Sequence, residues 1–174
     1  LGYLENQKLD EATSALQALA DKLPDDPLPW RNLAVARVVA LGDEGVETTP
    51  AAVQTALAAL AEMARREGVT SSYNWLSSQV AAAARDATAT QPTSADAWFA
   101  KFRAAQLLSD RELDAAAIQD LQRACEYRPE NAWLRVEWLR TVGSELLRLP
   151  EDGAAPAAGE LAAILADLPE QLTQ

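Results

Sequence analysis

The sequence contains no histidine, and Cys125 is its only cysteine. Histidine is the commonest general base and metal ligand in proteins, so the usual parts of hydrolytic and metal sites are missing. The chain also lacks a G-x-S-x-G motif and any Cys/His set with metal-binding spacing. We therefore expect a non-enzymatic protein with no catalytic residue, no metal and no cofactor. A single cysteine forms no internal disulfide, which leaves both the cytoplasm and the periplasm open as compartments.

Basic residues are also scarce, with 15 Lys and Arg against 26 Asp and Glu and a net charge of −11. Nucleic-acid phosphates and anionic membranes both attract basic surfaces, so we expect neither as a partner. No apolar run approaches the about 20 residues that span a bilayer, so we expect no membrane insertion. The few lysines among many arginines and alanines are typical of a GC-rich bacterial genome.

The residues that are abundant favour helices. Apolar residues make up 49% of the 174-residue chain, with Ala and Leu dominant and few β-branched runs. This length suffices for one domain with a real core, and no alternating strand pattern is present. The fold class that we predict is all-α.

Capping signals divide the chain into about eight helices. Asp26-Pro27 and Thr49-Pro50 each combine an N-cap with a proline in the first helical turn, and Ser109 with Glu112 forms a capping box. The sequence predicts helices over about 9–22, 27–42, 50–68 and 72–87, and a fifth helix that carries Trp98, Phe102 and Ala105. Further helices are expected from Ser109 to Pro129, from Asn131 to Leu146, and over 160–168. The apolar positions expected on these helices include Leu9, Ala12, Leu16 and Leu19; Val53, Ala56, Leu57, Leu60 and Met63; Ala117, Leu121 and Ala124; and Trp133, Val136, Leu139 and Val142.

Several features recur along the chain at a fixed spacing. Pro24 and Pro92 are 68 residues apart, which is twice 34, and a tryptophan follows each of them by six residues, at Trp30 and Trp98. A helix of small apolar residues precedes Pro24, Pro92 and Pro129 with the same offsets of twelve, eight and five residues. A recurring period of this length is typical of stacked helix pairs.

These residues resemble the tetratricopeptide repeat, a helix-turn-helix unit of 34 residues with the pattern W-x2-L-G-x2-Y. Trp30, Leu33, Ala34 and Arg37 stand at the first-helix positions, with Ala in place of Gly and Arg in place of Tyr. Residues 3–24 look like the end of a first helix followed by a whole second helix. The resemblance implies a right-handed solenoid of helix hairpins over 1–148. It is irregular in the middle, because three helices are expected between Pro24 and Pro92 where two units would supply four.

Residues 149–159 then form a linker, and a short helix within 160–174 packs on or caps the solenoid. Because the chain starts at Leu1 within a helical pattern, we interpret it as part of a longer protein whose other domains are expected partners.

The resemblance implies a scaffold that docks a protein or peptide in a concave groove. Two alternatives stay open: a structural or dimerising segment, and a helical domain that binds a small ligand or a carbohydrate. The candidate groove residues are Arg31 and Asn32, and the basic pair Lys101 and Arg103 on the next recognisable first helix. Asn32 matches a family position that binds C-terminal carboxylates. Trp75 is the expected exposed aromatic anchor.

Overall fold

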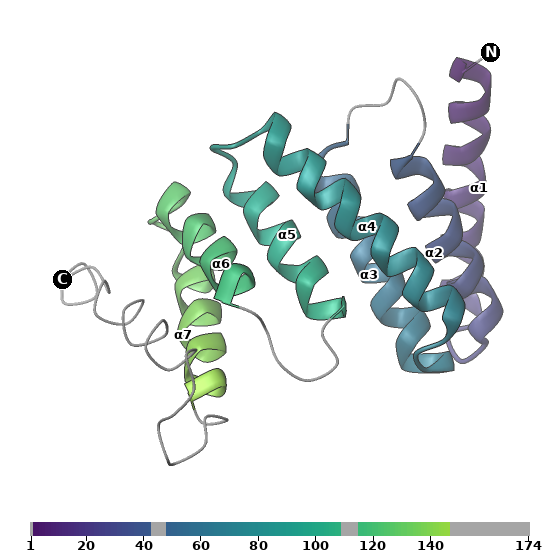
Figure 1. Cartoon of the computed structure of the whole chain (residues 1–174). Coiled ribbons are helices and arrows are strands. Elements are labelled where there is room, and N and C mark those ends of the chain that lie inside the picture. Colours follow the sequence, from purple (N-terminus) through teal and green to yellow (C-terminus); the bar gives the residue numbers. More distant parts are fainter. Residues whose placement is uncertain (1, 43–47, 109–114, 147–174) are drawn as a thin grey trace.

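The computed structural model describes residues 2–42, 48–108 and 115–146, and these residues form seven helices without a strand (Figure 1). The all-α prediction is therefore confirmed for the described part of the chain. The capping box at Ser109, the linker 149–159 and the expected helix over 160–168 lie outside the described residues. The helices are α1 (Gly2–Lys22), α2 (Pro27–Leu41), α3 (Pro50–Glu67), α4 (Ser71–Thr90), α5 (Ala95–Leu108), α6 (Ala115–Tyr127) and α7 (Ala132–Leu146).

Side-chain caps fix three of the helix starts, those of α2, α3 and α7, where the sequence places them. Asp26 accepts a hydrogen bond from the Leu28 amide at 3.0 Å, and Thr49 accepts one from the Ala52 amide at 3.2 Å. Each cap precedes a proline at the start of its helix. Asn131 caps α7 in the same way. These local signals position α2, α3 and α7 correctly because they satisfy free backbone amides of the first turn.

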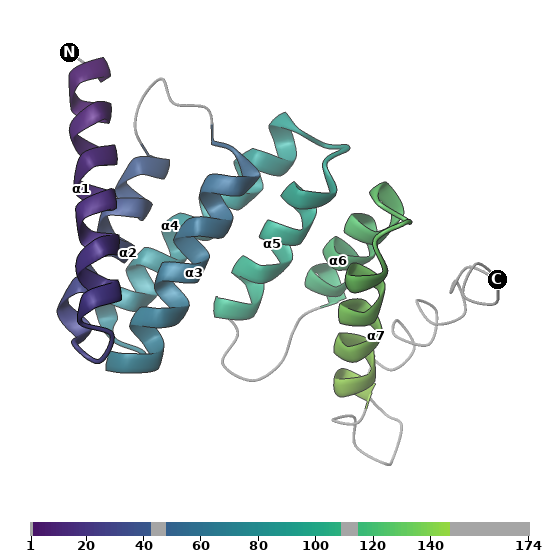
Figure 2. The same ribbon diagram turned by 180° about the vertical axis from the view of Figure 1, so that it is seen from behind.

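The helices form two layers. Each helix contacts the next one along the chain, and the pairs α2/α4 and α3/α5 also contact each other. Figure 1 shows α2, α4 and α6 nearer the viewer, and Figure 2, from behind, shows α1, α3, α5 and α7 in front. Sequential helices therefore alternate between the layers.

The buried core consists of two clusters that meet at α5. The first cluster joins α2, α3 and α4 and includes Leu33 and Leu60, neither of which exposes any surface. The second cluster joins α5, α6 and α7 and includes Phe102, which is also fully buried. Alanines on one face of α5 pack into the first cluster, while Phe99 and Phe102 pack into the second. We call these the first and second clusters below.

Two expectations at the ends of the stack are wrong. Helix α1 runs without a break from Gly2, so residues 3–24 are not the end of one helix followed by another. Ala12 and Leu19 are exposed, although Ala20 is fully buried. Ala12 and Leu19 are exposed because α1 contacts only α2 among the described helices, so only one narrow face of α1 is covered.

The side of α7 that faces the core differs from the side that the sequence predicts. Val142 is buried as expected, but Trp133, Val136 and Leu139 are exposed. Leu134 and Trp138 are buried in their place. Both sides of α7 are apolar, so periodicity alone does not determine which side faces the core.

The recurring tryptophans lie in opposite layers. Three helices, α2, α3 and α4, separate Pro24 from Pro92, as predicted. Because this number is odd, Trp30 on α2 and Trp98 on α5 occupy different layers, even though both follow a proline by six residues. The 68-residue period therefore matches a group of three helices rather than two hairpins.

Candidate functional site

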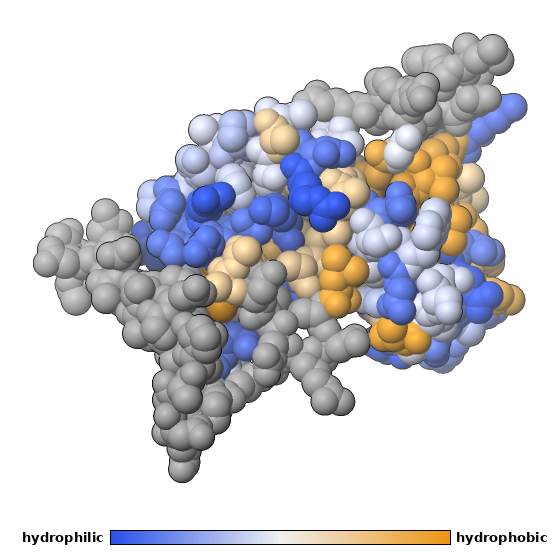
Figure 3. Space-filling model, in the orientation of Figure 1, coloured by the Kyte–Doolittle hydropathy of each residue, from blue (hydrophilic) through white to orange (hydrophobic). Residues whose placement is uncertain are grey.

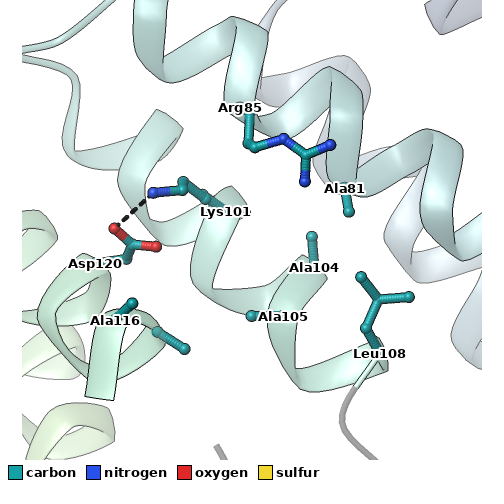
Figure 4. Close-up of a pocket in the computed structure, with 9 residues that line it drawn as sticks. Ala81, Arg85, Lys101, Ala104, Ala105, Leu108, Ala116 and Asp120 are labelled. Carbon is teal, nitrogen blue, oxygen red and sulfur yellow. Dashed lines mark hydrogen bonds and ion pairs between the residues drawn. The ribbon is translucent and has the colours of Figure 1, made fainter. Parts of the chain in front are cut away.

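A cleft lies between α4 and α6, with α5 as its floor (Figure 4). Helices α4 and α6 belong to the same layer, but no Cα atom of one lies within 8 Å of a Cα atom of the other. The resulting space has a volume of about 160 Å³. We call it the α4–α6 cleft. Its lining residues are Ala81, Arg85, Lys101, Ala104, Ala105, Leu108, Ala116, Ala117 and Asp120.

The charged groups of the α4–α6 cleft differ in how they are paired. The Lys101 ammonium donates to Asp120 Oδ1 at 2.9 Å, and Asp120 is buried. This pair bridges α5 and α6, and Figure 4 shows it on the side of the cleft away from Arg85. Arg85 is exposed on α4 and has no ion pair within the described residues. The cleft therefore combines a lysine that is neutralised by Asp120 with a guanidinium that no described acid neutralises, across a floor of alanines.

Exposed apolar side chains also lie on α2 and α4, in the layer of helices that borders the cleft and faces the viewer in Figure 1. On α2, Leu28, Val35 and Val39 are exposed, and on α4 Trp75 exposes 57% of its surface. Figure 3 shows this face, with apolar surface gathered at the upper right over α2. The exposure of Trp75 matches the prediction from the sequence.

The predicted groove residues do not form one site. Arg31 pairs with Glu67 at 2.7 Å, which raises the pKa of the arginine through a hydrogen bond, and Asn32 is exposed beside it on α2. Lys101 and Arg103 lie on α5, which does not contact α2. Arg103 is exposed and does not line the α4–α6 cleft, whereas Lys101 does.

Arg85 and Asp120 are the cleft residues that sequence reasoning missed. Arg85 follows a run of alanines on α4, and Asp120 is an acid on an otherwise apolar face of α6. The signal that could have identified Asp120 is its position as a charged residue on the apolar face of a helix, because a buried charged group needs a partner.

Trp30 and Trp98 stabilise the two proline turns. Trp98 donates from its indole nitrogen to the Pro92 carbonyl at 2.8 Å, and the Arg123 guanidinium lies 4.5 Å from its ring centroid. At Trp30 the cation is Arg66, which lies 4.4 Å from the ring centroid and donates to the Pro24 carbonyl. Both tryptophans pack against a cluster of the core while remaining partly exposed.

A second cleft lies between α1 and α3 over α2, with a volume of about 550 Å³. Arg37 lines it and donates to the Thr55 carbonyl at 3.1 Å and to the Gln17 amide oxygen at 2.8 Å. Burial lowers the pKa of Arg37. None of the described residues that line this cleft is aromatic, so these residues offer no stacking surface for a sugar ring. Its other lining residues are Asp10, Thr13, Ser14, Ala18, Asp21, Ala40, Leu41 and Ala52.

The chemistry available within the described residues is limited. Burial raises the pKa of the Cys125 thiol to about 11, which keeps it protonated and poorly nucleophilic at neutral pH. No group of three or more Cys, Asp and Glu side chains in the described ranges is placed to hold a metal ion. Of the seven described helices, none has the length and apolar character to cross a membrane.

Comparison with known proteins identifies no relative: no family model, no curated protein and no solved structure matches the chain. The clefts and exposed side chains are therefore the basis for the functional argument.

Proposed function

We propose that this chain is a helical-repeat module, similar to tetratricopeptide repeats, that docks a protein or peptide segment in the α4–α6 cleft without chemistry. The two-layer stacking of sequential helices supports the resemblance, since stacked helix pairs bury their shared faces and leave grooves between neighbours. The observation that carries the proposal is an alanine-lined cleft that no described residue fills, with Arg85 at its edge and without an ion pair to any described residue.

The size of the cleft favours a side chain of a larger partner over a free small molecule. Pockets for small ligands have volumes of about 300 to 1,000 Å³. The α4–α6 cleft, at about 160 Å³, is smaller than this range. A partner that anchors one side chain there gains its remaining contacts on the surface around the cleft. Trp75 on α4 and Val35 and Val39 on α2 are exposed apolar side chains of the same helix layer.

The lining favours an apolar anchor followed by an acidic group. Ala104 and Ala105 on the floor and Leu108 at one end offer apolar contact. Lys101 already pairs with Asp120, whereas Arg85 forms no ion pair among the described residues, so Arg85 is the cation that we expect to bind a carboxylate. A guanidinium binds a carboxylate with short, charge-assisted hydrogen bonds, often in pairs.

Selection from a random peptide library displayed on phage, against the immobilised chain, tests this proposal. Binding of the selected peptides is then measured by fluorescence anisotropy against purified variants. We expect selected peptides to share a small apolar residue next to Asp or Glu. Loss of a hydrogen bond to a charged group costs about 1.5 to 3 kcal/mol, so Arg85→Ala should weaken binding about tenfold or more.

Matched variants separate the cleft from the rest of the surface. Ala116 is exposed at the edge of the cleft, so Ala116→Trp should fill the cleft and abolish binding with little effect on folding. Ala58 on α3 is also exposed and lies outside the cleft, so Ala58→Trp should bind normally. Arg103→Ala removes the same charge as Arg85→Ala and should also bind normally. Failure to select any peptide, or equal binding by all four variants, would refute the proposal.

A further inference from the structure

Helix α7 presents an apolar side that no described helix covers. Trp133, Val136 and Leu139 expose 56%, 61% and 42% of their surfaces. The opposite side of the helix, with Leu134, Trp138 and Val142, is buried in the second cluster. An exposed valine or tryptophan is common by itself, but three large apolar residues on one side of a helix form a continuous surface.

The spacing of these residues makes a straight stripe. Ala132, Val136, Leu139 and Gly143 follow one another at i, i+4, i+7 and i+11, which is one face of a helix. Trp133 adjoins this row and touches α5 through the edge of its ring, 5.1 Å from the centroid of Phe99. We call Ala132, Trp133, Val136 and Leu139 the α7 stripe.

The α7 stripe lies at the end of the stack. Among the described helices, only α6 has Cα atoms within 8 Å of those of α7. Stacked helical proteins need a polar outer surface on their terminal elements, because an apolar one has no neighbour to bury it. The α7 stripe therefore requires a cover.

We propose that residues 160–168 of the same chain dock on the α7 stripe. The sequence places Leu161, Ile164, Leu165 and Leu168 at i, i+3, i+4 and i+7, so this segment has an apolar face with helical spacing. This occupant is independent of any peptide bound in the α4–α6 cleft.

Chain length permits this contact. Thirteen residues, 147–159, connect the end of α7 to residue 160. Fully extended, they span up to about 43 Å. The 15 residues of α7 are about 22 Å long. The segment 160–168 can therefore return along the whole α7 stripe.

The charges beside the two apolar faces are complementary. From Leu149 to Gln174 the sequence has five acidic residues and no Lys or Arg. On α7 the acids Glu137 and Glu145 are buried, whereas Arg140 is exposed and Arg135 is half-buried. Arg140 pairs with Glu137 at 2.6 Å and remains 64% exposed at its side chain, so its outer surface stays available to a further carboxylate. Both arginines favour an acidic occupant over a basic one.

Disulfide trapping tests the docking in the full chain. The variant carries Val136→Cys and Leu165→Cys, with Cys125→Ala to remove the native thiol. A matched control carries Gln119→Cys in place of Val136→Cys. Gln119 is exposed on α6, and because α6 and α7 are antiparallel neighbours it lies nearer to the end of α7 than Val136 does. An undocked segment would therefore reach Gln119 at least as readily.

We expect the Val136/Leu165 pair to form its intramolecular disulfide at least tenfold faster than the Gln119/Leu165 pair, as measured by mass spectrometry of linked peptides. Adding Leu161→Asp and Leu168→Asp, which leaves α7 unchanged, should reduce this rate to that of the control. Equal rates for the two pairs, or no effect of the aspartates, would overturn the proposal. Concentration-dependent disulfides between chains would also overturn it and would identify a second copy as the occupant.

Discussion

Truncation of Phe102 tests whether the two clusters of the core unfold separately. Phe102 is fully buried in the second cluster and packs near Phe99, with ring centroids 6.1 Å apart. Replacement of a buried Phe by Ala costs about 3 to 5 kcal/mol, since it removes apolar burial and leaves a cavity. Because stacked helices interact mainly with their neighbours, we expect this loss to fall on α6 and α7 rather than on α2 and α3.

Native-state hydrogen exchange measures this distribution. A loss of about 4 kcal/mol increases opening about a thousandfold, so amides of α6 and α7 should exchange about a thousandfold faster in Phe102→Ala. Amides of α2 and α3 should change less than about tenfold. Leu60→Ala, a truncation in the first cluster, should show the reverse pattern. An equal loss of protection in all four helices of Phe102→Ala would show one cooperative unit and would refute the reasoning.

Three further predictions concern single positions. Gly68 has φ of 76° and ψ of −173°, a backbone conformation that strains a residue with a side chain, so Gly68→Ala should lower the free energy of unfolding by about 1 to 3 kcal/mol. Gly42 has φ of −96°, so Gly42→Ala should leave this free energy nearly unchanged. Urea denaturation measures both. Lys101→Ala removes the ion pair that Lys101 forms with buried Asp120 and should cost about 1.5 to 3 kcal/mol, against less than about 0.5 kcal/mol for exposed Arg103→Ala. Burial raises the pKa of Cys125 to about 11 against 9.0, which implies about a hundredfold less thiolate at pH 8. The thiol of the folded chain should therefore react far more slowly with a chromogenic disulfide reagent than the thiol of the unfolded chain. Equal rates would contradict the burial of this thiol.

Local signals made most of the helices predictable from the sequence. Asp26, Thr49 and Asn131 cap helices where the sequence predicts them, and Gly68 ends α3. These signals depend on residues within a few positions of one another, so they need no knowledge of tertiary contacts. Helix α4 begins at Ser71, one residue before its predicted start, because the Thr70 hydroxyl caps it by accepting a hydrogen bond from the Tyr73 amide.

Features that depend on distant contacts were not predictable in the same way. Which side of α7 is buried depends on the position of α6, because Trp133 and Trp138 offer apolar surface on two sides of one helix. The α4–α6 cleft requires Arg85, Lys101 and Asp120 to meet from three helices, and no short motif links them. Of the predicted site residues, Lys101 lines this cleft, and Trp75 on α4 is exposed as predicted.

Mapping of a bound peptide by NMR tests the central claim most directly. A peptide obtained from the library is added to the isotope-labelled chain, and the backbone amide shifts are followed. The docking account predicts shift changes that concentrate on the lining of the α4–α6 cleft, including Arg85, Lys101 and Ala116, and that disappear in Ala116→Trp. Shift changes centred on another surface, such as the cleft between α1 and α3, would contradict it.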